Sequence, residues 1–169
     1  MILHPYRPGH RPTDQAACIV RLDEAERLGF AVEHIRLTGR PFGYATALVA
    51  RWERWDDWTL IEHDIEPSIE LLYSLGQCPE PLCTRPYAVR PSDGPFIEWA
   101  EQHRPSTSVA GFFGATRISA AARRALPLDR LPVAEWWHLD SVVTVALANA
   151  VGKPWHLHYE PLAHHHDSA

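Results

Sequence analysis

The chain has 169 residues, of which 46% are apolar and 22% charged, and its formal net charge is −5. This length favours one domain, the apolar fraction excludes a disordered chain, and the acidic balance argues against a general nucleic-acid coat, which would be basic. Fifteen prolines and nine glycines interrupt the chain too often for a simple helical bundle.

Predicted strands and helices alternate along the chain. We expect strands over residues 1–6, 30–37, 58–62, 87–89 and 153–159, and either a strand or a loop over residues 109–114. Helices are expected over residues 13–28, 44–55, 67–75, 95–102, 118–125 and 141–151. This alternation predicts an α/β fold, in which a central sheet of one domain is flanked by helices.

The chain has three cysteines, and so small and odd a number does not form a disulfide framework. Cys78 and Cys83 flank a Pro-rich turn, where they either remain thiols, close a small disulfide loop or contribute to a metal site that two thiols alone leave incomplete. The start of the sequence has no signal-peptide pattern, and no apolar run approaches the roughly 20 residues of a membrane span. We therefore expect a cytoplasmic protein without a membrane span.

Acidic residues follow the predicted strand at 58–62. Asp64 and Glu66 are two positions apart, so they point the same way from an extended chain. Ligands of α/β proteins gather outside the carboxyl ends of strands, and paired carboxylates suit a hard divalent ion such as Mg²⁺ or Mn²⁺. The alternative is an exposed, charged strand end without a ligand.

Two histidines lie on the last predicted strand. His156 and His158 share one face of an extended chain, while Leu157 faces the core. One imidazole would complete a metal shell begun by Asp64 and Glu66, whereas two together favour zinc. Surface or packed histidines are the alternative.

Asp140 follows a Trp-Trp-His-Leu run and immediately precedes the predicted helix at 141–151. A carboxylate beside bulky aromatic side chains is shielded from water, which tunes its proton affinity for work as a general base. The alternative is that Asp140 or Ser141 caps the helix.

Taken in order, these segments resemble a nucleotide-sugar-dependent glycosyltransferase of the GT-A fold, in a minimal, family-2-like form of actinobacterial or phage type. The run His4-Pro5-Tyr6-Arg7 resembles the start of that family's donor site, and residues 43–51 resemble the small-residue helix before its metal strand. Residues 60–66 resemble the metal strand with its DxD motif, in which Glu66 stands for the last Asp. Residues 111–117 resemble the acceptor-side segment, and residues 137–140 the motif that supplies the base.

The resemblance implies a metal-dependent transfer of a sugar from a UDP- or GDP-sugar to an acceptor hydroxyl, with inversion. It divides the chain into a donor and metal half at 1–66, an acceptor half at 67–160 and a histidine-containing tail at 161–169. The residues it implies are Asp140 as catalytic base; Pro5, Tyr6, Arg7, Gly43, His63 and Asp64 at the donor; Asp64, Glu66, His156 and His158 on Mn²⁺ or Mg²⁺; and Gly114, Trp137 and His138 on the acceptor side.

A small molecule or a glycan is the expected acceptor. Hydroxymethylated DNA is the second choice, because a compact transferase could reach an exposed base with few phosphate contacts. Four arginines near the acceptor segment could supply a local basic patch for it: Arg117, Arg123, Arg124 and Arg130. Two other functions stay open: a metal-dependent hydrolase using the late histidines with Asp64, and a nucleotide-binding module without turnover.

Overall fold

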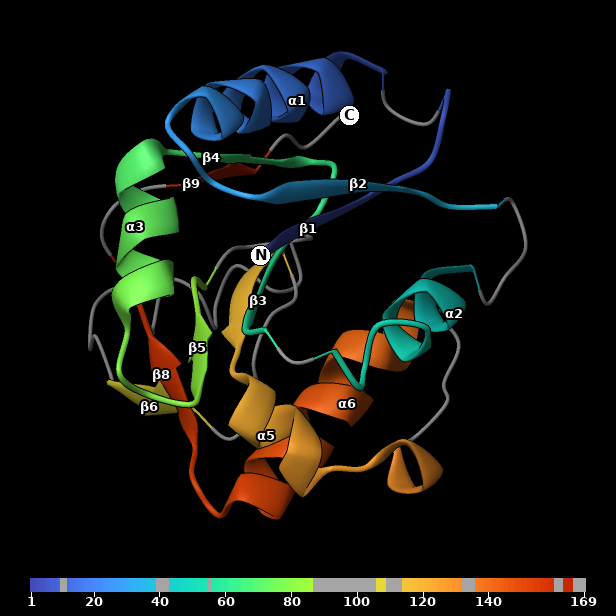
Figure 1. The fold of residues 1–169 in the computed structure, drawn as a ribbon, viewed down its shortest axis with the longest axis vertical. Helices are drawn as coiled ribbons and strands as arrows, with labels where there is room; N and C mark the ends of the chain where they lie inside the picture. The colour runs from blue at the N-terminus through green and yellow to red at the C-terminus, as the bar shows by residue number, and fades with distance from the viewer. Residues whose placement is uncertain are drawn as a thin grey trace.

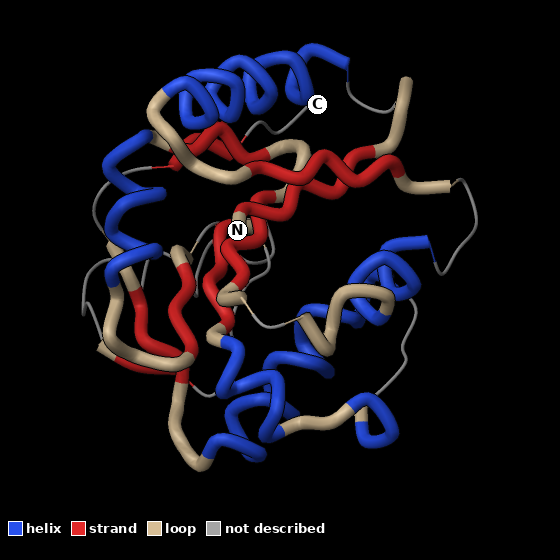
Figure 2. The backbone as a smooth tube through the Cα atoms, in the orientation of Figure 1, coloured by secondary structure: helices blue, strands red, loops and turns tan. Residues whose placement is uncertain are grey.

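In the computed structural model, a mixed seven-stranded sheet in the order β2-β1-β3-β7-β5-β8-β6 has helices on both faces (Figure 1). The structure describes residues 1–9, 12–38, 43–54, 56–86, 106–108, 114–131, 136–159 and 163–165. The alternation of helices and strands is visible in Figure 2. The predicted α/β fold with a flanked central sheet is thereby confirmed.

Three parallel strands form one half of the sheet: β2 (Val32–Arg36), β1 (Ile2–Tyr6) and β3 (Trp58–Ile61). Helix α1 (Pro12–Arg27) connects β1 to β2, and α2 (Gly43–Val49) lies between β2 and β3 in the chain. Gly29 follows α1 with a φ of 93°, a left-handed conformation that glycine adopts without a steric penalty.

The other half of the sheet is mixed. β7 (Ala115–Ile118) runs antiparallel to both β3 and β5 (Leu82–Thr84), β8 (Trp155–Leu157) is parallel to β5, and β6 (Thr107–Ser108) is antiparallel to β8. It follows that β1, β2, β3, β5 and β8 all point the same way. Their carboxyl ends define one edge of the sheet, which we term the carboxyl edge.

A separate two-stranded sheet pairs β4 (Ile65–Pro67) with β9 (Ala163–His165) in antiparallel register. The remaining helices are α3 (Ile69–Gln77), α5 (Ala120–Ala125), the 3₁₀ turn η1 (Leu128–Arg130) and α6 (Trp136–Val151). Ser68 and Ser119 cap α3 and α5, because each hydroxyl accepts a hydrogen bond at 3.1 Å from a backbone N–H of the first turn.

Two apolar cores cover the two faces of the sheet. On one face α1 and α3 bury Cys18, Leu22, Leu71 and Leu75 around Ile61. On the opposite face α2, α5 and α6 pack on β1 and β3, and this core contains three large indoles that are almost fully buried: Trp52, Trp58 and Trp155. No helix within the described part of the chain has the length and hydropathy to cross a bilayer.

Several predicted elements differ in their bounds. α2 ends at Val49 rather than at 55, and α6 begins at Trp136 rather than at 141. The short strands β4, β5, β6, β7 and β9 were not predicted. The strand predicted at 87–89, the helix predicted at 95–102 and most of the segment at 109–114 lie outside the described residues.

Candidate functional site at the carboxyl edge

The carboxyl edge contains a topological switch point between β1 and β3. From β1 the chain passes through α1 to β2 on one side, and then through α2 to β3 on the other side. Helix α1 packs on one face of the sheet and α2 on the opposite face (Figure 1). In open α/β sheets, ligands bind in the crevice at such a point.

The predicted donor residues of the first strand lie at this switch point. Pro5 is buried inside β1, Tyr6 is half-buried at its end, and Arg7 is exposed directly after it. The buried Gln15 on α1 fixes this exit, because its amide donates a hydrogen bond of 2.7 Å to the Arg7 carbonyl. The Arg7 side chain therefore starts from a defined backbone position.

Glu62 is the first residue after β3, and its surroundings hold it in place. Its backbone N–H donates to the Gly114 carbonyl at 2.9 Å, which puts the predicted acceptor-side glycine beside the acidic segment. The Tyr44 hydroxyl donates to Glu62 Oε1 at 2.8 Å. Glu62 is not among the site residues predicted from sequence, although its spacing from Asp64 equals that of Asp64 from Glu66 and could have identified it.

Gly43 allows α2 to begin close to the end of β2. A Cβ at this position would lie 2.6 Å from the Thr38 carbonyl oxygen, so any side chain would require the backbone to move. This close approach brings the next residue, Tyr44, within reach of Glu62. The structure thus gives Gly43 a steric role at the carboxyl edge, and its contact with a donor stays a prediction.

Asp64 and Glu66 both lie near α1. The pKa of the Cys18 thiol is raised, mainly by burial and further by the negative charges of these two carboxylates. Glu66 Oε1 accepts a hydrogen bond of 3.0 Å from Arg21 on α1, and Arg21 also contacts Glu24. A guanidinium therefore already balances the Glu66 carboxylate, which makes this residue a poorer metal ligand than the sequence implies.

The late histidines have a different neighbourhood. His156 lies in β8 and His158 directly follows this strand; their ring centroids are 4.8 Å apart, so the two rings lie side by side. His158 Nδ1 lies 2.9 Å from the hydroxyl of Ser74 on α3. Burial, with a smaller contribution from His156, lowers the pKa of His158 to about 4, so the ring is neutral at neutral pH.

The predicted four-residue metal set is not assembled. Among the described residues, two groups of three ligand atoms lie within 4.8 Å of one another: Cys78 with Cys83 and His158, and the exposed Asp23 with Glu26 and His34. Neither group contains Asp64 or Glu66. The structure thus does not bring His156 or His158 together with these carboxylates in either group, and their joint binding of one ion stays a prediction.

A second histidine pair lies under α1. His4 is fully buried in β1, and its Nδ1 is 2.9 Å from Nδ1 of the exposed His34 on β2. Burial, followed by the charges of His34 and His63, lowers the pKa of His4 to about 3. His63 thus lies on the side of the site that faces His4, which itself stacks on Tyr6 with ring centroids 5.7 Å apart.

The predicted base lies inside a helix. Because α6 begins at Trp136, Asp140 and Ser141 are interior helix residues, and the alternative that either caps this helix is wrong. Helix α6 runs back against β8, since Trp155 Nε1 donates to the Thr144 carbonyl at 2.9 Å. Its first turns, which contain Trp137, His138 and Asp140, are therefore directed toward the carboxyl edge; their side chains lie outside the described part of the structure.

The expected basic patch loses two of its four members. Arg117 is buried, donates to the Glu80 carbonyl at 2.7 Å and pairs with Asp57. Arg123 is also buried and lies over the Trp58 ring. Only Arg124 and Arg130 of this set are exposed, so the predicted surface for DNA phosphates is not formed as expected.

No protein-family model matches this chain, and no curated protein does. A solved structure described as the crystal structure of A197 from STIV is similar, with a TM-score of 0.58 and 11% sequence identity. The match covers 99% of this chain and 85% of that chain. At this identity the likeness concerns the fold alone, and it agrees with the α/β architecture of the described residues.

Proposed function

We propose that this chain is a metal-dependent glycosyltransferase that moves a sugar from a UDP- or GDP-sugar to an acceptor hydroxyl. The observation that carries the proposal is the pair of carboxylates, Glu62 and Asp64, directly after β3 at the switch point of the sheet. Nucleotides bind at switch points of open α/β sheets, and carboxylates are the usual protein ligands of ions that bind substrate phosphates.

The acidic turn after β3 fits Mn²⁺ or Mg²⁺. The charges of Asp64 and Glu66 add to the effect of burial, which is the main cause of the raised pKa of the nearby Cys18, and carboxylate oxygens are the ligands that hard cations prefer. Asp64 and Glu62 would hold the ion, since Glu66 is paired with Arg21. When bound, such an ion offsets the charge that develops on a leaving diphosphate.

The chain's own residues divide the remaining work. Arg7 is exposed beside the switch point, and its planar guanidinium suits a phosphate. Asp140 accepts the proton of the acceptor hydroxyl while that oxygen attacks the anomeric carbon from the face opposite the diphosphate. The new carbon–oxygen bond forms as the bond to the diphosphate breaks, so a single displacement inverts the configuration.

The acceptor is a small molecule or a glycan. Gly114 lies beside Glu62, which supports an acceptor-side position for the start of β7, and the resemblance to glycosyltransferases assigns Trp137 and His138 to the same side. Hydroxymethylated DNA is less favoured than the sequence alone indicated, because the burial of Arg117 and Arg123 removes half of the expected phosphate contacts.

Donor binding is expected to require a divalent ion and Asp64. A ligand that binds the native state raises its apparent stability, so UDP- or GDP-sugars should raise the Tm with Mn²⁺ and have no effect in excess EDTA. Asp64→Asn should remove this Tm shift and lower transfer on the order of 100-fold. The exposed Glu53→Gln is the matched control and should behave like wild type; full transfer in EDTA would refute the metal requirement.

Asp140→Asn is expected to leave donor affinity nearly unchanged and to lower kcat on the order of 10²-fold or more, because a base acts in the transition state. Calorimetry with the donor and mass detection of added hexose measure the two effects separately. Unchanged kcat in the folded variant would remove Asp140 from the mechanism. Nucleotide binding by wild type without sugar transfer or hydrolysis would instead identify a non-catalytic module.

A further inference from the structure

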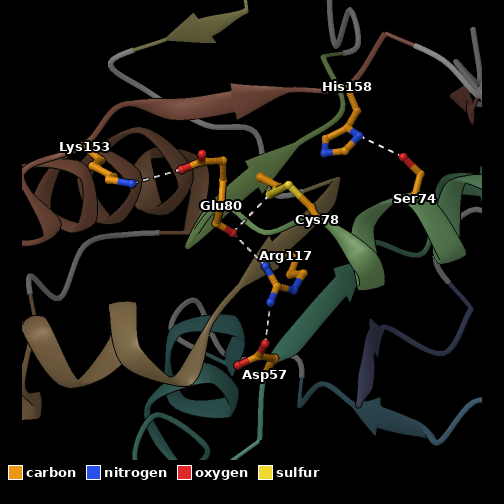
Figure 3. Close-up of a disulfide and its surroundings, with 8 residues drawn as sticks. Asp57, Ser74, Cys78, Glu80, Arg117, Lys153 and His158 are labelled. Carbon is orange, nitrogen blue, oxygen red and sulfur yellow. Dashed lines mark hydrogen bonds and ion pairs between the residues drawn. A yellow bond between two sulfur atoms is a disulfide. The ribbon is translucent and has the colours of Figure 1, made fainter.

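Cys78, Cys83 and His158 come together from three elements on the α3 side of the sheet. Cys78 is the C-cap residue of α3, Cys83 lies in β5, and His158 follows β8, the parallel neighbour of β5. The two sulfur atoms and a ring nitrogen lie within 4.8 Å of one another. Both cysteines are buried, and in this structure they form a disulfide (Figure 3).

The orientation of His158 is that of a metal ligand. Its Nδ1 is hydrogen-bonded to Ser74 Oγ at 2.9 Å, while its Nε2 is buried and makes no hydrogen bond within the described structure. Figure 3 shows this second nitrogen turned toward the sulfur atoms. Metal-binding histidines are typically arranged in this way, with one ring nitrogen on the ion and the other fixed by a hydrogen bond.

The backbone around the two cysteines also suits a shared ion. Their Cα atoms are 7.1 Å apart, which exceeds the usual range of about 4.4–6.8 Å for a disulfide. Two thiolates at about 2.3 Å from one tetrahedral zinc lie about 3.8 Å apart, so they accept a wider Cα spacing. Arg117 holds the intervening turn by donating to the Glu80 carbonyl, and Lys153 pairs with the Glu80 carboxylate, so the backbone between the two cysteines is fixed.

We propose that Cys78, Cys83 and His158 bind one Zn²⁺ when the protein is reduced, with water at the fourth position. A dithiol reductant opens the disulfide and is itself oxidised to a disulfide, passing two electrons and two protons to the cysteine sulfurs. Both thiol protons leave when zinc binds. The thiolate and imidazole ligands select zinc and separate this site from the oxygen-rich turn at Asp64. Either the S–S bond or the metal joins the end of α3 to β5, and the metal adds the end of β8.

The test uses the full chain, reduced with a phosphine that adds no thiol of its own. After removal of free metal, we expect the reduced protein to retain one Zn²⁺ per chain. In the oxidised protein, the two cysteines should bind no Zn²⁺. Substitution with Co²⁺ should give the near-ultraviolet charge-transfer absorption of a thiolate–cobalt bond. This absorption excludes ions held by His164, His165 and His166, and a variant with alanine at all three should keep it.

Cys83→Ser and His158→Asn are expected to lower the affinity for Zn²⁺ at least about 100-fold. The matched controls Cys18→Ser and His156→Asn should bind it as tightly as wild type. In reduced wild type, Zn²⁺ should also protect Cys78 and Cys83 from alkylation, a measurement that needs no variant. Absence of zinc uptake, unprotected thiols or equal losses in the controls would overturn the proposal. None of these measurements involves a nucleotide sugar, so their outcome is independent of the proposed transferase activity.

Discussion

Arg123→Leu is expected to lower the free energy of unfolding by about 3–5 kcal/mol, the scale on which a buried charged network is lost. Arg123 is 1% exposed, and its guanidinium donates to the carbonyls of Arg51, Trp52 and Asp56. These carbonyls belong to the turn between α2 and β3. The Arg51 carbonyl also accepts a hydrogen bond of 3.1 Å from the Arg54 backbone N–H, so removing the guanidinium chiefly costs the bonds to the Trp52 and Asp56 carbonyls, which are shielded from water.

The same side chain also supports the aromatic core. Its guanidinium carbon lies 4.0 Å from the centroid of the Trp58 ring, and Trp58 packs edge-on against Trp52. Burial lowers the pKa of Arg123 to about 10, so the side chain keeps its charge at neutral pH. Arg123→Lys should retain the charge but lose the forked donor geometry, giving an intermediate loss of stability.

Urea unfolding of the variants measures this effect. Arg124→Leu is the matched control, because Arg124 is the exposed neighbour on the same helix and its replacement should change stability by no more than about 0.5 kcal/mol. Similar losses for Arg123→Leu and Arg124→Leu would contradict the role assigned to Arg123.

Acidification is expected to destabilise the protein steeply below about pH 6.5, through His4 and His158. Their pKa values fall from 6.5 to about 3 and about 4 on folding. At pH values between the folded and the unfolded pKa, each histidine binds a proton in the unfolded chain but not in the folded chain. The contribution of the neutral histidines to the free energy of unfolding is therefore complete above pH 6.5 and is lost as the pH falls. Each histidine contributes a slope of about 1.4 kcal/mol per pH unit in its window.

The slope of stability against pH, from urea unfolding at several pH values, tests this prediction. Between pH 6 and 5, His4→Leu and His158→Asn should each reduce the slope of the unfolding free energy against pH by about 1.4 kcal/mol per pH unit, the value for one proton. This comparison does not depend on the absolute stability of either variant. If neither variant changes the slope, the acid sensitivity arises elsewhere.

The fold was predictable where local patterns are strong. β1, α1, β2, β3 and α3 appear close to their predicted positions, because turn glycines, a capping serine and runs of apolar residues mark them in the sequence. β7 was missed because Ala115–Ile118 contains a threonine and an arginine yet is buried throughout. Arg117 is tolerated there because it pairs with Asp57, a partner distant in sequence.

The candidate site was predictable only in outline. The acidic segment after β3 was located correctly at a strand end, since strand ends of α/β sheets are where polar side chains gather. The partners that alter individual roles are long-range: Arg21 binds Glu66 from α1, and Ser74 binds His158 from α3. The spacing of residues along one strand does not show which side chain of a packed helix will contact them.

The pairing of β4 with β9 has a consequence for the order of folding. Ile65, the residue directly after Asp64, pairs with His165, so synthesis must proceed about a hundred residues beyond the acidic turn before this ladder closes. Contacts of such large sequence separation form late, because closing the intervening loop costs entropy before the contact stabilises it. In a nascent chain, most of the central sheet therefore forms before the β4–β9 pairing orders the segment next to the acidic turn. A metal ion present during synthesis would encounter that turn in a less ordered form.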